Sequence, residues 1–154
     1  MLLLAALLSA APLAVPFVPQ QKDSCGAAAL AMVLRYWQQP ASHDEIAQAL
    51  LEPELKGILG SRLEAFARER GMTAIAYRGD MAQLREYVAK GRPLIVAWKV
   101  GRGRYHDVVV VGLEEGAVLV HDPADGASRR VAAGDFEERW AGAGHWTLLV
   151  MPAP

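Results

Sequence analysis

The pattern of apolar and polar positions predicts that the first half of the chain is mainly helical. An almost continuous apolar run over 26–37 is typical of a buried helix, and Pro40 marks its end. Asp23 or Ser24, just before the run, can cap this helix. The chain reaches it through a stretch, 15–19, that its prolines keep extended. A buried helix entered from a polar, extended segment is therefore expected near the start of the chain.

Three more helices are predicted from capping signatures followed by apolar faces. They begin after Ser42, Ser61 and Asp80 and end near Leu51, Gly71 and Ala89, respectively. His43, in the first turn of the first of these, is expected to be a solvated surface residue.

From Leu94 onward, β-branched runs separated by glycine-bearing turns replace the helical pattern. The expected strands are 73–77, 94–100, 105–111, 117–121 and 145–151, with a turn at Asp125-Gly126 and a short helix over 136–140. Consecutive strands joined by short turns form an antiparallel meander. The fold class is therefore predicted to be α+β, with N-terminal helices packed on a C-terminal antiparallel sheet.

Composition narrows the classes of protein to which the chain can belong. Its 154 residues, 53% hydrophobic and 21% charged, suit one globular domain. A formal net charge of -1 with dispersed Lys and Arg gives no footprint for nucleic acid, and Arg102 and Arg104 are taken as ordinary loop charges. The single cysteine excludes an intramolecular disulfide, and no Cys and His spacing matches a structural zinc site.

The N-terminal residues Met1–Ala14 are almost entirely Leu and Ala, which is typical of the apolar region of an export signal. The stretch is too short to span a membrane, and small residues offer cleavage positions before Val15. We therefore expect a signal peptide over 1–14, a domain over 15–154, and a periplasmic or secreted location. A missing charged n-region keeps two alternatives open, an uncleaved anchor or an incorrectly assigned start codon.

The only cysteine, Cys25, lies where the polar segment meets the apolar run. A thiol at a helix N-terminus faces unpaired backbone N–H groups and the positive end of the helix dipole, so the thiolate is favoured over the thiol. Cys25 is therefore predicted to be a nucleophile. The alternative is a small buried core residue.

A hairpin predicted from the Glu114-Glu115-Gly116 turn would bring a histidine and an aspartate together. If Gly112 lies opposite Gly116 or Ala117, His106 lies opposite Asp122 or Pro123, at a Cβ separation of roughly 4.5–5.5 Å. A carboxylate at that distance can accept a hydrogen bond from an imidazole.

Two other histidines, His121 and His145, are alternative candidates for the same role. His121 neighbours Asp122 in sequence, but successive strand residues point to opposite faces, so His121 is expected to turn away from the site. His145 has no acidic or nucleophilic neighbour in the local sequence and is expected to be structural.

Three motifs resemble those of the C39 peptidases, papain-like cysteine peptidases that process bacteriocin leaders in bacteria. The motifs are a Gln before Cys25-Gly26 and the apolar helix, the block Tyr105–Gly112, and the block Val118–Pro123, with Phe136–Trp140 resembling the family's ending. Their order and spacing are also similar, and the resemblance covers roughly 15–152.

The resemblance implies a papain-like fold and a thiol protease mechanism without metal or organic cofactor. In this mechanism Cys25 attacks the scissile carbonyl, His106 exchanges the proton, and Asp122 orients the imidazole. Gln20 would hold the oxyanion together with the Cys25 backbone N–H. Gln21 is one residue nearer the cysteine, and the Pro19-Gln20 pairing favours Gln20.

The substrate and the partners stay open. Well-known relatives cleave after a double glycine in peptide leaders and are fused to exporter domains, so a peptide or protein substrate and a separate exporter are expected here. The alternatives are a C39-like domain that binds leader peptides without cutting them, and a papain-fold amidase or transpeptidase acting on cell-wall peptides. Cys25 argues against the first, because degenerate members typically lose the nucleophile.

Overall fold

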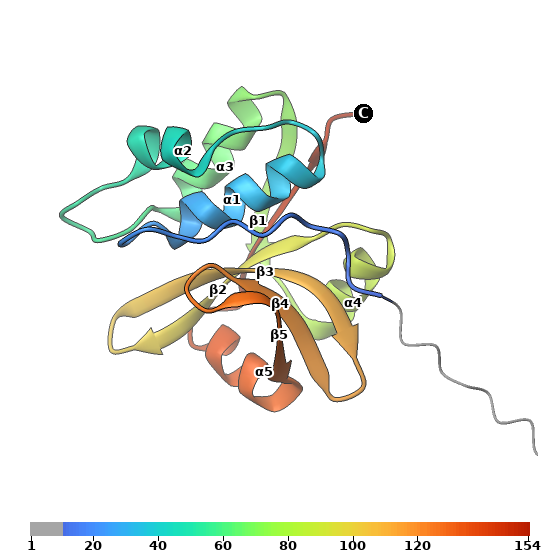
Figure 1. Cartoon of the computed structure of the whole chain (residues 1–154). Coiled ribbons are helices and arrows are strands. Elements are labelled where there is room, and N and C mark those ends of the chain that lie inside the picture. Colours follow the sequence, from blue (N-terminus) through green and yellow to red (C-terminus); the bar gives the residue numbers. More distant parts are fainter. Residues whose placement is uncertain (1–10) are drawn as a thin grey trace, which may run out of the picture.

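The computed structural model describes residues 11–154, which form one antiparallel sheet with helices on both faces (Figure 1). The helices are α1 (Cys25–Tyr36), α2 (His43–Leu50), α3 (Gly60–Glu69), α4 (Met81–Ala89) and α5 (Ala133–Ala141). The strands are β1 (Met72–Arg78), β2 (Leu94–Gly101), β3 (Arg104–Glu114), β4 (Ala117–Asp122), β5 (Gly126–Ala132) and β6 (Trp146–Pro152). The predicted α+β class is confirmed. The predicted signal peptide, 1–14, lies mostly outside the described residues.

The sheet separates two apolar cores, because alternate side chains of its strands point to opposite faces. Its strand order is β1-β6-β2-β3-β4-β5, and all the pairs are antiparallel. Helices α1, α2 and α3 pack on one face, above Val109 and Val111 of β3. Helices α4 and α5 cover the other face, where Phe136 and Trp140 meet Val108 and Val110. Consecutive side chains of β3 therefore pack into different cores.

Helix α1 is the central helix of the first core, as its apolar sequence predicts. Its residues from Gly26 to Leu34 are all buried, and it packs across β3 and against α2. Its predicted capping is wrong. Ser24 occupies the position before the helix, but its side chain makes no cap bond. Instead the hydroxyl bonds the backbone of Gln21, and so closes the turn that leads into α1.

The other helix starts confirm two of three predicted caps. Ser42 accepts from the Glu45 backbone N at 3.0 Å, and Asp80 accepts from that of Gln83 at 2.8 Å. Ser61 does not cap α3, which begins one residue earlier at Gly60 and has no side-chain cap. Gly60 lies so close to Trp146 that an added Cβ would be 2.5 Å from the indole ring. This tertiary contact places Ser61 inside the first turn.

The hairpin of β3 and β4 has a different register from the predicted one. Gly112 lies opposite Leu119, not Gly116 or Ala117, and Val110 lies opposite Val120 after a bulge. The turn is shorter than expected because Gly116 adopts a φ of 71°, which lets two residues reverse the chain. His106 is therefore not directly opposite Asp122.

Strand β5 was not predicted. It pairs with β4 at the edge of the sheet, most of its residues are exposed, and Ser128, Arg129 and Arg130 are polar. No helix over residues 11–154 combines the length and apolar character needed to cross a membrane.

Candidate active site

Cys25 is the first residue of α1, and its half-buried thiol lies against the start of β3. The backbone N–H of Asp107 donates to Sγ at 3.5 Å, so the sulfur lies beside the peptide that joins His106 to Asp107. The helix body behind the cysteine is fully buried, which fixes the thiol relative to the sheet. The sulfur therefore has two sources of N–H groups, the first turn of α1 and the β3 backbone.

His106 and Asp122 form the closest polar contact near this thiol. Nε2 of His106 donates to Oδ1 of Asp122 across 2.6 Å, and about one seventh of each side chain is exposed, 13% and 15%. The backbone N–H of Ala124 also donates to that carboxylate oxygen, at 2.9 Å, and so holds it in place. The Cys25 thiol is near enough to this imidazole to contribute to its raised pKa. Because Nε2 is engaged, Nδ1 is the nitrogen that can exchange a proton with the thiol.

The electrostatics of this group favour a charged imidazole. Burial acts to lower the pKa of His106, but hydrogen bonds with Asp122 and Cys25 and their negative charges outweigh it and raise the pKa to about 10. Burial acts to raise the pKa of Asp122, yet the bond from His106 and two backbone N–H groups keep it below its ordinary value. An imidazolium and a carboxylate therefore coexist at neutral pH.

The two candidate glutamines are placed differently. The Gln20 backbone N–H donates to the Pro123 carbonyl at 3.0 Å, next to Asp122, and the side-chain Oε1 is buried without a partner among the described residues. Gln21 is exposed, and its amide donates to Asp44 at 3.4 Å. Only Gln20 is thus joined directly to the turn that follows the aspartate.

Asp107 is a site residue that sequence reasoning missed. Its Oδ2 lies 4.0 Å from Sγ of Cys25, and the side chain is on the same face of β3 as Val109, beneath α1. Burial raises the pKa of Asp107 to about 6, and the neighbouring His106 charge opposes this effect. The alternation of side chains along β3 could have predicted that Asp107 faces α1. Its proximity to the Cys25 thiol could not be predicted, because it depends on how α1 packs on the sheet.

The comparisons with known proteins bear on the family and the fold. The family model described as the Peptidase_C39 like family matches residues 12–147. The chain belongs to this family. A search of curated proteins finds no match. As a C39-like protein, the chain shares its fold with a set of solved peptidase domains.

Three solved structures illustrate the similarity. One is a double glycine motif protease from an AMS/PCAT transporter, in complex with the leader peptide, 25% identical with a TM-score of 0.76 over 92% of this chain and 94% of that one. The peptidase domain of Streptococcus ComA, a bi-functional ABC transporter, is 23% identical with a TM-score of 0.76, covering 88% and 97%. A putative C39-like peptidase from Bacillus anthracis is 18% identical with a TM-score of 0.74, covering 91% and 96%.

His43 of this C39-like chain is not the solvated residue that its position at a helix start predicts. It is 9% exposed, and its Nε2 lies 2.7 Å from Oγ of Ser24, which is itself buried. Its Nδ1 lies 2.8 Å from Oδ1 of Asp44. The path Asp44–His43–Ser24 thus ends on the hydroxyl that closes the turn between Gln21 and Cys25. Sequence gave no signal for this contact, because residues 24 and 43 meet only when α1 and α2 pack together.

The other two histidines lie outside this C39 site. His121 is buried, with Nε2 bonding the Val15 carbonyl at 2.8 Å and Nδ1 accepting from the Ser128 backbone at 3.0 Å. It faces away from Asp122, as strand alternation predicts. His145 has no acidic neighbour in the local sequence, but in the structure its Nε2 lies 2.6 Å from Oε1 of Glu137 on α5. The partner lies eight residues back and is brought near by the turn after α5.

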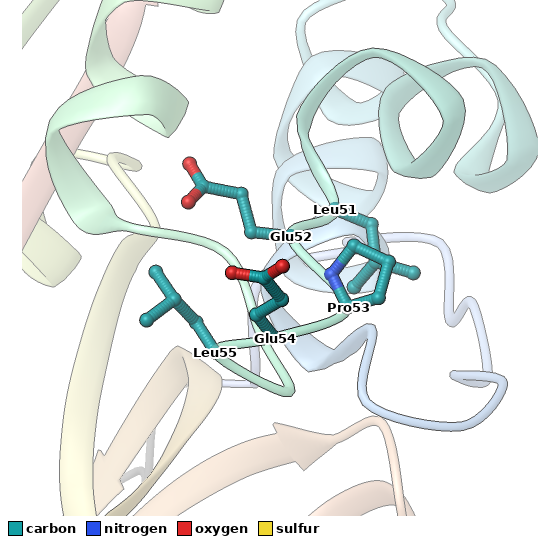
Figure 2. A pocket seen from close by; sticks show the side chains of 5 residues that line it. All are labelled: Leu51, Glu52, Pro53, Glu54 and Leu55. Carbon is teal, nitrogen blue, oxygen red and sulfur yellow. The ribbon is translucent and has the colours of Figure 1, made fainter.

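Two further features complete the surroundings of the site. Within residues 11–154, no three His, Cys, Asp or Glu side chains are grouped to hold a metal ion. A hollow in the loop between α2 and α3 is lined by residues 51–55, and Figure 2 shows the side chains around it. Its lining includes none of the candidate catalytic residues.

Proposed function

We propose that the chain is a cysteine peptidase in which Cys25, His106 and Asp122 act as a triad. The observation that carries the proposal is the 2.6 Å contact of His106 with Asp122, made beside the peptide whose N–H donates to Sγ of Cys25, the only cysteine, at 3.5 Å. A nucleophile, a base within hydrogen-bond reach and a third group orienting the base make up the arrangement that activates a thiol. Membership of the C39 peptidase family supports the same assignment.

The steps follow from the atoms present. Sγ of Cys25 attacks the scissile carbonyl carbon, and the proton held by Nδ1 of His106 passes to the leaving amine, which leaves an acyl-enzyme. Water then loses a proton to Nδ1 and attacks the acyl carbon, and the thiolate leaves with the carboxylic acid product released. Asp122 keeps Nε2 protonated and stabilises the imidazolium throughout.

Gln20 is proposed as the side-chain donor to the developing oxyanion, with the Cys25 backbone N–H as the second donor. The support for this role is the position of Gln20 in the structure. Gln20 is joined through Pro123 to the turn that carries Asp122, whereas the Gln21 amide is turned toward Asp44. A donor fixed to the same turn as the triad can hold its position during the reaction.

The proposed substrate is a peptide of the leader type. One similar structure is a double glycine motif protease solved with its leader peptide, and another belongs to an ABC transporter. We propose by analogy that this chain trims a peptide that a separate exporter handles, and that it acts in the periplasm or outside the cell.

The deciding experiment is mass spectrometry of a peptide library incubated with the purified domain. The library should include double-glycine sequences, unrelated peptides and cell-wall peptides, and Cys25→Ala serves as the control. Cleavage by the wild-type chain alone supports the peptidase assignment, and the cut sites define the specificity. Peptide binding by both chains without cleavage would instead identify a leader-binding module. Release or exchange confined to wall peptides would identify an amidase or transpeptidase.

A further inference from the structure

We propose that Asp107 is a further catalytic residue, whose carboxyl group controls how much of the Cys25 thiol is ionised. The inference rests on the geometry at the sulfur, where Oδ2 of Asp107 lies 4.0 Å from Sγ and the backbone N–H of the same residue donates to Sγ at 3.5 Å. The residue thus contacts the reacting atom with both its main chain and its side chain. This inference concerns the same site as the proposed function, and the catalytic role of Asp107 rests on that function.

The carboxyl group lies close to the first turn of α1. A Cβ added at Gly26 would lie 2.9 Å from Oδ2, so the glycine is what allows the carboxyl to approach the first turn of α1. The same added atom would lie 3.2 Å from Leu63 and 3.6 Å from Ile58, which shows that apolar side chains close this side of the site. The carboxyl therefore has a short path to the sulfur and little room to turn away.

Few charged groups face Asp107. From α1 it meets Cys25, and on its own strand it is next to His106. Its partner on β2 is Ala97, and Leu63 of α3 lies nearby, and neither of these residues carries a charge. His106 is already committed to Asp122. Among the described residues Asp107 forms no ion pair of its own, which agrees with a pKa raised by burial to about 6.

The two protonation states act oppositely on the thiol. A protonated carboxyl can donate to sulfur and leaves the thiolate undisturbed. An ionised carboxyl places a second negative charge about 4 Å from the thiolate, and such a charge changes an ionisation equilibrium by roughly tenfold to a thousandfold in a partly buried site. Ionisation of Asp107 therefore withdraws reactive thiolate as pH rises through about 6.

The test measures the rate at which iodoacetamide alkylates Cys25 at a series of pH values between about 4 and 9. Intact-mass spectrometry monitors the reaction. Cys25 is the only thiol, so the signal belongs to one residue. The chains compared are wild type, Asp107→Asn and, as a matched loss of one exposed carboxylate, Asp135→Asn.

The ratio of the Asp107→Asn rate to the wild-type rate should be near one at acidic pH. It should rise to roughly tenfold or more above pH 7, with its midpoint near 6. The Asp135→Asn ratio should stay flat. A flat ratio for Asp107→Asn as well would overturn the proposal.

Two additions keep the outcome decisive. Circular dichroism at each pH confirms that the compared chains are folded, and Asp107→Ser supplies a second neutral side chain if the asparagine does not fold. Alkylation needs no substrate, so the absence of peptide cleavage with an intact pH-dependent ratio would overturn the proposed peptidase function but leave the control of Cys25 ionisation by Asp107 standing.

Discussion

Nε2 of His106 and Oδ1 of Asp122 lie 2.6 Å apart, although the two residues are not partners in the β3–β4 ladder. The ladder runs from Glu114 opposite Ala117 to Val109 opposite His121, so the contact forms beyond its last pair. The carboxylate is held there by the Ala124 backbone N–H in the turn that follows β4. The position of the base thus depends on the end of a strand and on the turn beside it.

Replacing Asp122 with Asn should lower kcat/KM by roughly 10²- to 10⁴-fold, because a neutral amide orients the ring but stabilises its charge poorly. The pKa of His106 should fall from about 10, since the bond and charge of Asp122 help to raise it. An NMR titration of the imidazole together with kcat/KM measures both effects, with Asp135→Asn as the control. An unchanged imidazole titration would show that the two side chains are not coupled.

Gln20→Ala should lower kcat by roughly 10²- to 10³-fold with little change in the free energy of unfolding, because one oxyanion donor is lost. Gln21→Ala is the matched control, since its exposed amide reaches only Asp44. Steady-state kinetics of both variants on a cleaved peptide gives the comparison. If the Gln21 variant shows the loss and the Gln20 variant does not, the donor is misplaced by one residue.

The two histidines of the hairpin should separate catalysis from stability. His106→Ala should abolish turnover and leave the fold intact. His121→Ala should keep turnover but lower the free energy of unfolding by roughly 1–3 kcal/mol, because it leaves the buried Val15 carbonyl and Ser128 N–H without their partner. Urea unfolding and kcat/KM on both variants decide the matter. If His121→Ala is folded but inactive and His106→Ala is active, then His121 and not His106 is the catalytic base.

Asp107 should make the folded chain less stable as pH rises. Its folded pKa of about 6 lies above the ordinary value of 3.8, so the folded state binds its proton more tightly than the unfolded state does. Its stabilising contribution is therefore present below pH 3.8 and is lost as pH rises to about 6. The stability difference between wild type and Asp107→Asn should shift against wild type by on the order of 1 kcal/mol between pH 4 and pH 7. Urea unfolding at both pH values measures this, and equal differences would contradict the buried carboxyl.

Export can be tested independently of activity. If 1–14 is a signal peptide, protein isolated from its native host should begin between Pro12 and Val15 and be found in the periplasm or the medium. N-terminal sequencing of fractionated cells gives the result. An intact Met1 in the cytoplasmic fraction would show that the segment is not a cleaved signal.

Local signals predicted most of the elements, and tertiary contacts account for the errors. The apolar run after Cys25 and the caps at Ser42 and Asp80 place their helices correctly, because a capping side chain and a buried face are local features. Strand β5 escaped prediction because an exposed edge strand carries no alternating apolar pattern. The predicted β3–β4 register was wrong because the turn leaves Glu114 opposite Ala117, and the bulge between Val110 and Gly112, which no residue pattern indicates, changes the register again.

The same distinction applies to the site. Cys25 could be selected from its place at a helix start, and His106 and Asp122 from the predicted hairpin and the family resemblance, although the predicted register was wrong. Their roles remain predictions for the variants above to test. Asp107 and His43 could not be selected, because their significance comes from a helix packed over the sheet and from one helix packed on another.

The close packing of α1 on the sheet also sets the distance between the thiol and its base. His106 and Asp122 share one hairpin, whereas Cys25 belongs to a helix in a separate layer, and only the side chains between the layers connect them. Helix α1 carries four fully buried alanines, Ala27, Ala28, Ala29 and Ala31, and those on its sheet-facing side lie between the layers. Their small side chains let α1 lie close to the sheet. A bulkier residue on the sheet-facing side of α1 would therefore move Cys25 away from His106 and reduce activity without altering any atom that takes part in the reaction.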